Sequence, residues 1–208
     1  MRKHVMKLMM TALLMVLVVP FVNAQVKVGD ILCKNDSIVT PAEYDTLNVV
    51  ALGVVFYVDD SGEHGWAVSL QDEGLFTWGG YGVDTDLSNF TCRGKASDDV
   101  DGYNNTKTIL ESGKNYPAFN AVDFSSGWYL PAAGQLKRLY KCMDDVNPSL
   151  TKVGGMPVKP IGLTYWSSTE YSDIEAWYLI TIGGLEHTSD GYNDNKSGVH
   201  FVRGVRNF

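Results

Sequence analysis

Residues 48–70 read NVVALGVVFYVDDSGEHGWAVSL, and this stretch decides most of what the sequence predicts about the fold. Residues 48–59 form an apolar run of strand length, and many of its members are β-branched. Asp60, Ser61 and Gly62 form a turn signal, and a second strand candidate follows at residues 65–70. The stretch therefore predicts a β-hairpin.

One helix is clear further along the chain. Apolar residues recur 3, 4 and 7 positions after Leu136, at Leu139, Tyr140 and Met143. This spacing places an apolar stripe on a helix over residues 132–144. Since proline lacks a backbone N–H, Asn147-Pro148 is expected to end this helix.

The last part of the chain is predicted to return to strand and loop. Residues 177–182 (WYLITI) and 200–206 (HFVRGVR) have strand composition. Residues 183–198 are polar and glycine-rich, so they are predicted to be an exposed loop, and residues 74–90 an irregular loop packed by its own aromatic side chains.

Residues 1–24 have the pattern of an export signal. Three basic residues and no acidic residue occur in this segment, an apolar run occupies residues 8–19, and Ala24 ends a short Val-Asn-Ala sequence suited to cleavage. The apolar run is shorter than the roughly 20 residues that a spanning helix needs, so no membrane span is predicted. We expect a signal peptide at 1–24, a single domain at 25–208, and an exported location: secreted, periplasmic or at the cell surface.

Charge and cysteine content restrict the partners. Loss of Arg2, Lys3 and Lys7 would lower the formal net charge from −7 to −10, and so acidic a chain is not expected to bind nucleic acid. The three cysteines allow at most one internal disulfide, whose pairing the sequence leaves open. Without a Cys-x-x-Cys motif or closely spaced histidines, we expect no metal centre and no cofactor. The cysteines are Cys33, Cys92 and Cys142.

Residues 98–106 (DDVDGYNNT) allow two interpretations. Alternating carboxylates before a glycine favour a calcium loop, although the closing glutamate at the twelfth position is missing. The other interpretation is a turn before a helix that begins near Thr106, with Thr108 and Glu111 in capping-box spacing. Calcium binding therefore stays open.

Catalytic motifs were not found in the sequence. The nucleophile elbow, the phosphate-binding loop, the dinucleotide-binding glycine pattern and the zinc-protease motif are all missing. We therefore expect a protein that is not an enzyme. A polysaccharide-acting enzyme with two paired carboxylates is kept as an alternative, because such a pair needs no fixed spacing in sequence.

Several segments together resemble one family. GWYLPAAGQL at 127–136, YWSSTEY at 165–171, AWY at 176–178 and VRGVRNF at 202–208 resemble exported bacterial proteins with a C-type-lectin-like domain, known as DUF1566 or the Fibrobacter major paralogous domain. GVVFYV at 53–58, HGW at 64–66 and DGYNNT at 101–106 resemble the Bacteroidetes branch of that family. The resemblance covers nearly all of residues 25–208.

The resemblance implies an α+β, C-type-lectin-like fold. Two helices would lie against small antiparallel sheets, with long loops and with the N- and C-terminal strands paired to each other. Related domains include the variable proteins of diversity-generating retroelements, in which changes concentrate in the region that matches residues 165–208 here. The Glu-Pro-Asn, Gln-Pro-Asp and Trp-Asn-Asp sequences of calcium-dependent sugar-binding lectins are not present, so their mode of sugar binding is not carried over.

Side chains inside these segments are expected to be structural. Trp128, Trp166 and Trp177 are predicted to be core residues, because each ring removes a large apolar area from water. One of Arg203 and Arg206 is expected to pair with an inner carboxylate while the other faces water. The hydroxyl groups of the Ser-Ser-Thr run are expected to bond backbone groups and not to act as nucleophiles. That run is Ser167, Ser168 and Thr169.

A binding site is predicted on the late loops. Tyrosine offers a large contact area at a small entropy cost, and asparagine offers adaptable hydrogen bonding, as in antibody-like binding surfaces. The sequence therefore favours an exported ligand-binding or adhesion module for a protein or glycan; a structural subunit of a surface assembly or fimbria is a further alternative. The candidate ligand-binding residues are Tyr171, Asp173, Glu175, Tyr178, Asp190, Tyr192, Asn193, Asn195 and His200.

Overall fold

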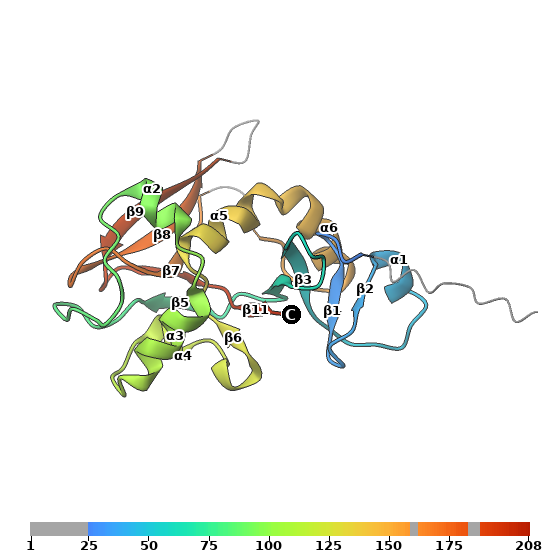
Figure 1. Ribbon diagram of the computed structural model, residues 1–208, viewed down its shortest axis with the longest axis horizontal. Coiled ribbons are helices and arrows are strands. Elements are labelled where there is room, and N and C mark those ends of the chain that lie inside the picture. Colours follow the sequence, from blue (N-terminus) through green and yellow to red (C-terminus); the bar gives the residue numbers. More distant parts are fainter. Residues whose placement is uncertain (1–24, 159–161, 183–187) are drawn as a thin grey trace, which may run out of the picture.

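The computed structural model describes residues 25–158, 162–182 and 188–208, although not the side chains of residues 181–182 and 188–191 (Figure 1). The predicted export signal at 1–24 and residues 183–187 of the predicted late loop lie outside this part of the chain. The described residues form two β-sheets and six α-helices, which confirms the α+β class.

The first sheet, sheet A, contains the predicted hairpin. Its strand order is β2-β1-β3-β4-β11-β6, and β3 and β4 pair antiparallel, as residues 48–70 predict. The predicted pairing of the N- and C-terminal strands is wrong: β1 and β11 belong to the same sheet, but β3 and β4 lie between them. The strands are β1 Ile31–Cys33, β2 Ile38–Val39, β3 Ala51–Val58, β4 Gly65–Ser69, β6 Trp128–Tyr129 and β11 Val205–Asn207.

The second sheet, sheet B, has the order β5-β10-β7-β8-β9. All neighbours are antiparallel except β10 and β7. The prediction of an exposed loop over 183–198 is wrong for β9, because its backbone pairs with β8 along eight residues and an edge strand tolerates polar side chains. The strands are β5 Gly74–Thr77, β7 Thr164–Glu170, β8 Glu175–Ile182, β9 Thr188–Asn195 and β10 Val199–Val202.

The segment predicted as one strand at 200–206 is two strands in different sheets. β10 lies between β5 and β7 in sheet B, and β11 lies between β4 and β6 in sheet A. The change of sheet occurs at Arg203 and Gly204, where the carbonyl of Gly204 accepts a hydrogen bond from the N–H of Ser69. A single alternating pattern hides this change because both strands are short.

Helices α5 and α6 run along one side of the molecule, from sheet B to strand β3 (Figure 1). The predicted helix at 132–144 corresponds to α5, which ends when Cys142 leaves helical geometry (φ −115°, ψ 19°). Pro148 does not end it: this exposed residue lies inside the following helix, α6. The helices are α1 Pro41–Tyr44, α2 Arg93–Asp98, α3 Gly102–Glu111, α4 Pro117–Asn120, α5 Ala133–Lys141 and α6 Met143–Lys152, with a 3-10 turn at Phe124–Ser126.

The start of α3 differs from the prediction. The helix begins at Gly102 and not near Thr106, and the Asp101 side chain caps it by accepting the N–H of Asn104. Thr108 and Glu111 therefore lie within the helix and do not form a capping box. The predicted pair of helices is thus part of a larger set. The short helices α1, α2 and α4 have too few residues for a visible periodicity, and α6 contains Pro148, which was expected to end a helix.

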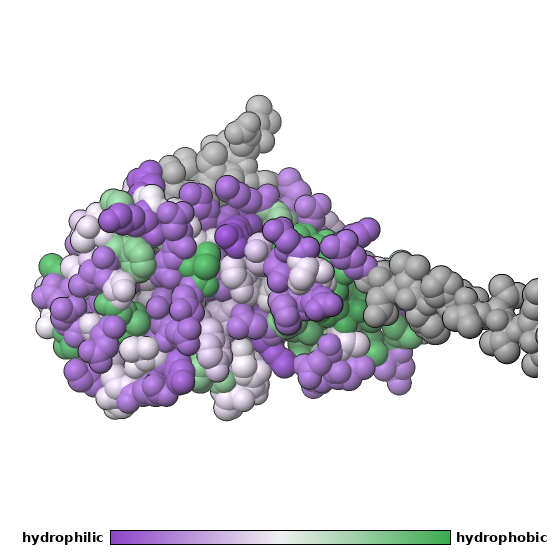
Figure 2. Space-filling model, in the orientation of Figure 1, coloured by the Kyte–Doolittle hydropathy of each residue, from purple (hydrophilic) through white to green (hydrophobic). Residues whose placement is uncertain are grey.

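Two apolar clusters occupy the two faces of sheet B. Trp177 and Leu179 pack with residues of α5 and α6 in one cluster, while Trp166 and Ala176 pack with Trp78 in the other. The prediction of core tryptophans is confirmed for Trp166 and Trp177, whereas Trp128 is only half-buried. The surface in Figure 2 is largely hydrophilic, with apolar residues in separate patches. The three cysteines are free thiols.

Candidate functional site

The residues predicted to bind a ligand do not form one surface. Tyr178 lies opposite Tyr192 in the β8–β9 ladder, whereas Glu175 lies opposite Asn195. Because successive side chains of a strand point to opposite faces, these two pairs belong to different faces of sheet B. Asn193 shares the second face, since it lies opposite Trp177.

The turn between β7 and β8 adds two of the predicted residues. Tyr171 packs edge-on against Trp177, with ring centroids 5.6 Å apart, so it belongs to the face that α5 covers. Asp173 is exposed at the turn. The backbone of Asp190 pairs with Ile180, but the side chain of Asp190 lies outside the described part of the structure.

A row of aromatic rings crosses the other face of sheet B. Tyr178 stacks on His200 with ring centroids 4.3 Å apart and lies 6.2 Å from Tyr192. Trp166 contacts both Tyr178 and His200 edge-on. Of the nine predicted residues, the row therefore brings together Tyr178, Tyr192 and His200, with the two tyrosines at its partly exposed end.

His200, one of the predicted ligand-binding residues, is a buried member of that row. It is 7% exposed, and its ring nitrogens are bonded to the hydroxyl of Thr164 and the carboxylate of Asp194. Burial lowers the pKa of His200, and its hydrogen bond to the Asp194 carboxylate opposes this shift. The imidazole therefore contributes packing and not contact area.

A buried ion pair at the end of β9 was missed by the sequence analysis. The side chains of Lys196 and Glu170 are both 0% exposed, and the Lys196 ammonium donates to the Glu170 carboxylate and to the carbonyl of Val83, at 3.0 Å. Thr85 donates to the same carboxylate, and the ring of Trp78 lies 4.8 Å from the Lys196 Nζ. Burial raises the pKa of Glu170, and its bonds with Lys196 and Thr85 oppose the rise.

A second buried ion pair confirms the prediction for the two late arginines. Arg203 is paired with Asp72 at 3.1 Å and also donates to the carbonyls of Ser69 and Met156. Arg206 instead pairs at 2.8 Å with Asp36, whose side chain is 71% exposed. Arg203 thus joins the β4–β5 connection to the segment between β10 and β11.

The Ser-Ser-Thr run has the structural role that was expected. The hydroxyl of Ser167 donates to the carbonyl of Trp177, and the hydroxyl oxygen of Thr169 accepts the N–H of Ala133 at 2.9 Å. Thr169 therefore caps α5 from a distant strand, which compensates for the alanine at the N-cap position, Ala132.

The carboxylates of residues 98–106 are used inside the protein. Asp99 accepts hydrogen bonds from the backbone of Asp101 and from the side chains of Asn105 and Thr169. Asp101 caps α3, which supports the capping interpretation of this segment. Within the described ranges, no group of three or more His, Cys, Asp or Glu residues is arranged to hold a metal ion.

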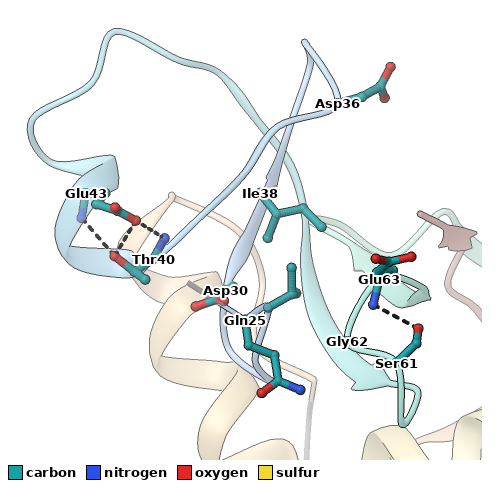
Figure 3. A pocket seen from close by; sticks show the side chains of 10 residues that line it. Gln25, Asp30, Asp36, Ile38, Thr40, Glu43, Ser61, Gly62 and Glu63 are labelled. Atoms are coloured by element: carbon teal, nitrogen blue, oxygen red, sulfur yellow. Dashed lines mark hydrogen bonds between the residues drawn. The ribbon is translucent and has the colours of Figure 1, made fainter. Parts of the chain in front are cut away.

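A broad hollow of about 790 Å³ lies near the start of the described chain (Figure 3). Carboxylate side chains surround the hollow on several sides, but three of these side chains already have a partner within the protein. Asp30 accepts the N–H of Lys27, Glu43 is bonded to Thr40, and Asp36 is paired with Arg206. Burial raises the pKa of Asp30, and the hydrogen bond from Lys27 opposes the rise. The hollow is lined by Gln25, Val26, Asp30, Asp36, Ile38, Thr40, Glu43, Ser61, Gly62 and Glu63.

Comparisons with known proteins include a match to a solved structure. No family model matches the chain, and no curated protein matches it. Among solved structures, the chain is similar to a fimbrial protein from Bacteroides ovatus, with a TM-score of 0.67 and 18% identity. The match covers 88% of this chain and 49% of that protein, so the chain spans about half the length of the solved structure. At this identity the likeness concerns the fold.

No helix among the described residues is long and apolar enough to cross a membrane.

Proposed function

We propose that this protein is an exported, non-catalytic module of a cell-surface assembly of the fimbrial type. The observation that carries the proposal is the likeness in fold to a fimbrial protein over 88% of the chain. The leader predicted at residues 1–24 and the resemblance to exported proteins with a C-type-lectin-like domain agree with it.

The internal use of charged groups supports a role that is not catalytic. A glycosidase needs two carboxylates that face its substrate. The carboxylates of Glu170 and Asp72, whose side chains are 0% and 5% exposed, are each paired with a cation inside the protein. The paired-carboxylate alternative therefore gains no support from these two groups.

Adhesion through sheet B is a second candidate function. Tyr178 and Tyr192 lie together on one face, and the ring of Tyr192 also lies 4.9 Å from the Arg93 guanidinium. Partly exposed aromatic rings of this kind are favoured in recognition surfaces. The proposed adhesive patch therefore consists of Tyr178 and Tyr192 and not of all nine residues predicted to bind a ligand.

Affinity purification of the tagged protein from its own cells tests the assembly proposal. We expect the protein in the surface fraction, co-purifying at fixed stoichiometry with other surface proteins. Recovery of the protein alone from that fraction, after mild cross-linking, would overturn the proposal.

The adhesion candidate has a matched pair of variants. Tyr192→Ala removes a ring from the aromatic row, whereas Asn193→Ala changes the adjacent residue, on the opposite face. We expect loss of cell or glycan attachment with the first variant and not with the second. Equal attachment by both variants and the unaltered protein would exclude this face.

A further inference from the structure

A cavity of about 300 Å³ opens beside Trp128, between sheet A and the segment around the 3-10 turn. Its walls combine one indole ring with carboxylate, amide and small apolar groups. This volume lies at the lower end of the range for small-molecule sites, which is about 300 to 1,000 Å³. Its lining includes Ser69, Gln71, Glu73, Ala121, Asp123 and Trp128.

Trp128 differs from the buried tryptophans of the protein. The indole N–H groups of Trp78, Trp166 and Trp177 each donate to a backbone carbonyl. The indole N–H of Trp128 has no hydrogen-bond partner among the described residues, yet it is not a buried unsatisfied group, so solvent reaches it. A half-buried indole with an accessible donor is therefore part of the cavity wall.

Gly53 allows the ring of Trp128 to lie close to strand β3. A Cβ atom at Gly53 would lie 3.0 Å from Cη2 of the indole, whereas one at Gly204 would make an ordinary contact of 3.5 Å with Cε3. The absence of a side chain at Gly53 therefore lets the ring rest on the backbone. This support fixes the position of the ring, which reduces the entropy cost of binding a ligand against it.

Hydrogen-bond acceptors lie beside the ring. The hydroxyls of Ser125 and Ser126 donate to Asp123 and lower its pKa, so this carboxylate is ionised and oriented at neutral pH. The exposed carboxylate of Glu73 lines the same cavity. The side-chain N–H of Gln71 donates to the carbonyl of Gly154, which leaves its amide oxygen as a further acceptor.

We propose that this cavity binds one ring of a neutral saccharide. An indole packs against the apolar C–H face of a sugar ring, and carboxylate and amide oxygens accept bonds from its hydroxyl groups. The carboxylates of Glu73 and Asp123 repel an acidic sugar, so the cavity prefers neutral rings. The site lies on sheet A, so it goes beyond the proposed function and does not depend on the tyrosines of sheet B.

Titration of purified residues 25–208 with single sugars tests the site. The probes are the methyl glycosides of glucose, galactose, mannose and N-acetylglucosamine, with glucuronic acid as the acidic comparison and choline as a cation. Calorimetry and indole fluorescence are the readouts. We expect saturable binding of at least one neutral glycoside and at least tenfold weaker binding of glucuronic acid.

Two variants and a control connect binding to the cavity. Trp128→Phe and Glu73→Gln are each expected to weaken binding several-fold; Glu73 is exposed, so its variant keeps the fold if Trp128→Phe does not. Trp66→Phe is the control, because Trp66 already stacks on Tyr57 and lies beneath Arg138. Binding should be unchanged in this control.

Three results would overturn the proposal: no binding of any neutral glycoside, binding of choline alone, or equal binding by Glu73→Gln and the unaltered protein. None of these results bears on surface assembly, which is measured in cells. Failure of the saccharide site can therefore be distinguished from failure of the proposed function.

Discussion

Sheets A and B are held together in different ways. Apolar clusters cover strands of both sheets, but Arg206 of strand β11 in sheet A forms its ion pair at the surface. In sheet B, the fully buried pair of Lys196 and Glu170 joins the residue after β9 to the end of β7. β9 is polar, and the register of a polar strand is only weakly specified by hydrophobic burial. The difference teaches that a buried ion pair can fix the register of a strand whose own polar side chains do not specify it.

Removal of one member of this pair should have the largest effect. Lys196→Met leaves the Glu170 carboxylate buried without a cation, and the free energy of unfolding should fall by about 3–5 kcal/mol. Urea unfolding measures the loss. Lys152→Met is the control, because its partner Asp45 is 60% exposed, and it should cost less than about 1 kcal/mol.

The double variant Lys196→Met, Glu170→Leu sharpens the comparison. Replacement of both charges by apolar side chains should recover much of the loss, because no isolated charge stays buried. Equal stability of Lys196→Met and Lys152→Met would show that the buried pair does not distinguish sheet B from sheet A.

Sheet A should be more sensitive to close backbone packing. A Cβ atom at Gly53 would lie 2.5 Å from the carbonyl oxygen of Val68, so Gly53→Ala must move the β3–β4 pair apart. We expect a loss of about 1–3 kcal/mol in unfolding free energy, measured by chemical denaturation. Gly94→Ala, in α2, meets no atom within 4 Å and should be neutral or slightly stabilising. A neutral Gly53→Ala would contradict this description of sheet A.

The cap that sheet B supplies to α5 should have a smaller effect. Thr169→Val keeps the side-chain shape but removes the hydroxyl that accepts from Ala133 and donates to Asp99. We expect a loss of about 1–2 kcal/mol in thermal or urea unfolding. Thr169→Ser keeps the hydroxyl and should retain most of the stability. If Thr169→Ser and Thr169→Val lower the free energy of unfolding equally, loss of the cap is not the cause of the destabilisation.

The smallest effect concerns pH. Burial lowers the pKa of His200 below its ordinary value of 6.5, so the unfolded chain binds a proton first as pH falls. This residue should therefore destabilise the fold as pH falls below 6.5. Comparison of unfolding free energies at about pH 7.5 and 5.5 should show a smaller decline in His200→Gln than in the unaltered protein. The opposite order would mean that the Asp194 bond outweighs burial.

Short-range sequence patterns were enough to predict one hairpin and one helix of the fold. The β3–β4 hairpin and α5 follow from an apolar run and a 3.6-residue period. β9 was missed because its sequence, TSDGYNDN, has the composition of a loop and gains its pairing from β8. The change of sheet at Arg203 was missed because each strand beside it has four residues or fewer.

The candidate site was harder to predict than the fold. Tyr178 and Tyr192 were found from their residue type, but their separation from Glu175 and Asn195 depends on strand register, which the sequence does not display. Lys196 lies in a polar stretch where a lysine is ordinarily solvated, so its burial had no local signal.

The segment from β10 to β11 has a consequence for synthesis of the chain. It supplies an interior strand to each sheet, and every strand that it pairs with comes earlier in the sequence. Domains emerge from the ribosome starting with their first residues, so neither sheet can close until residues 199–207 have been translated. Both sheets of the nascent polypeptide therefore stay incomplete until this segment has been made.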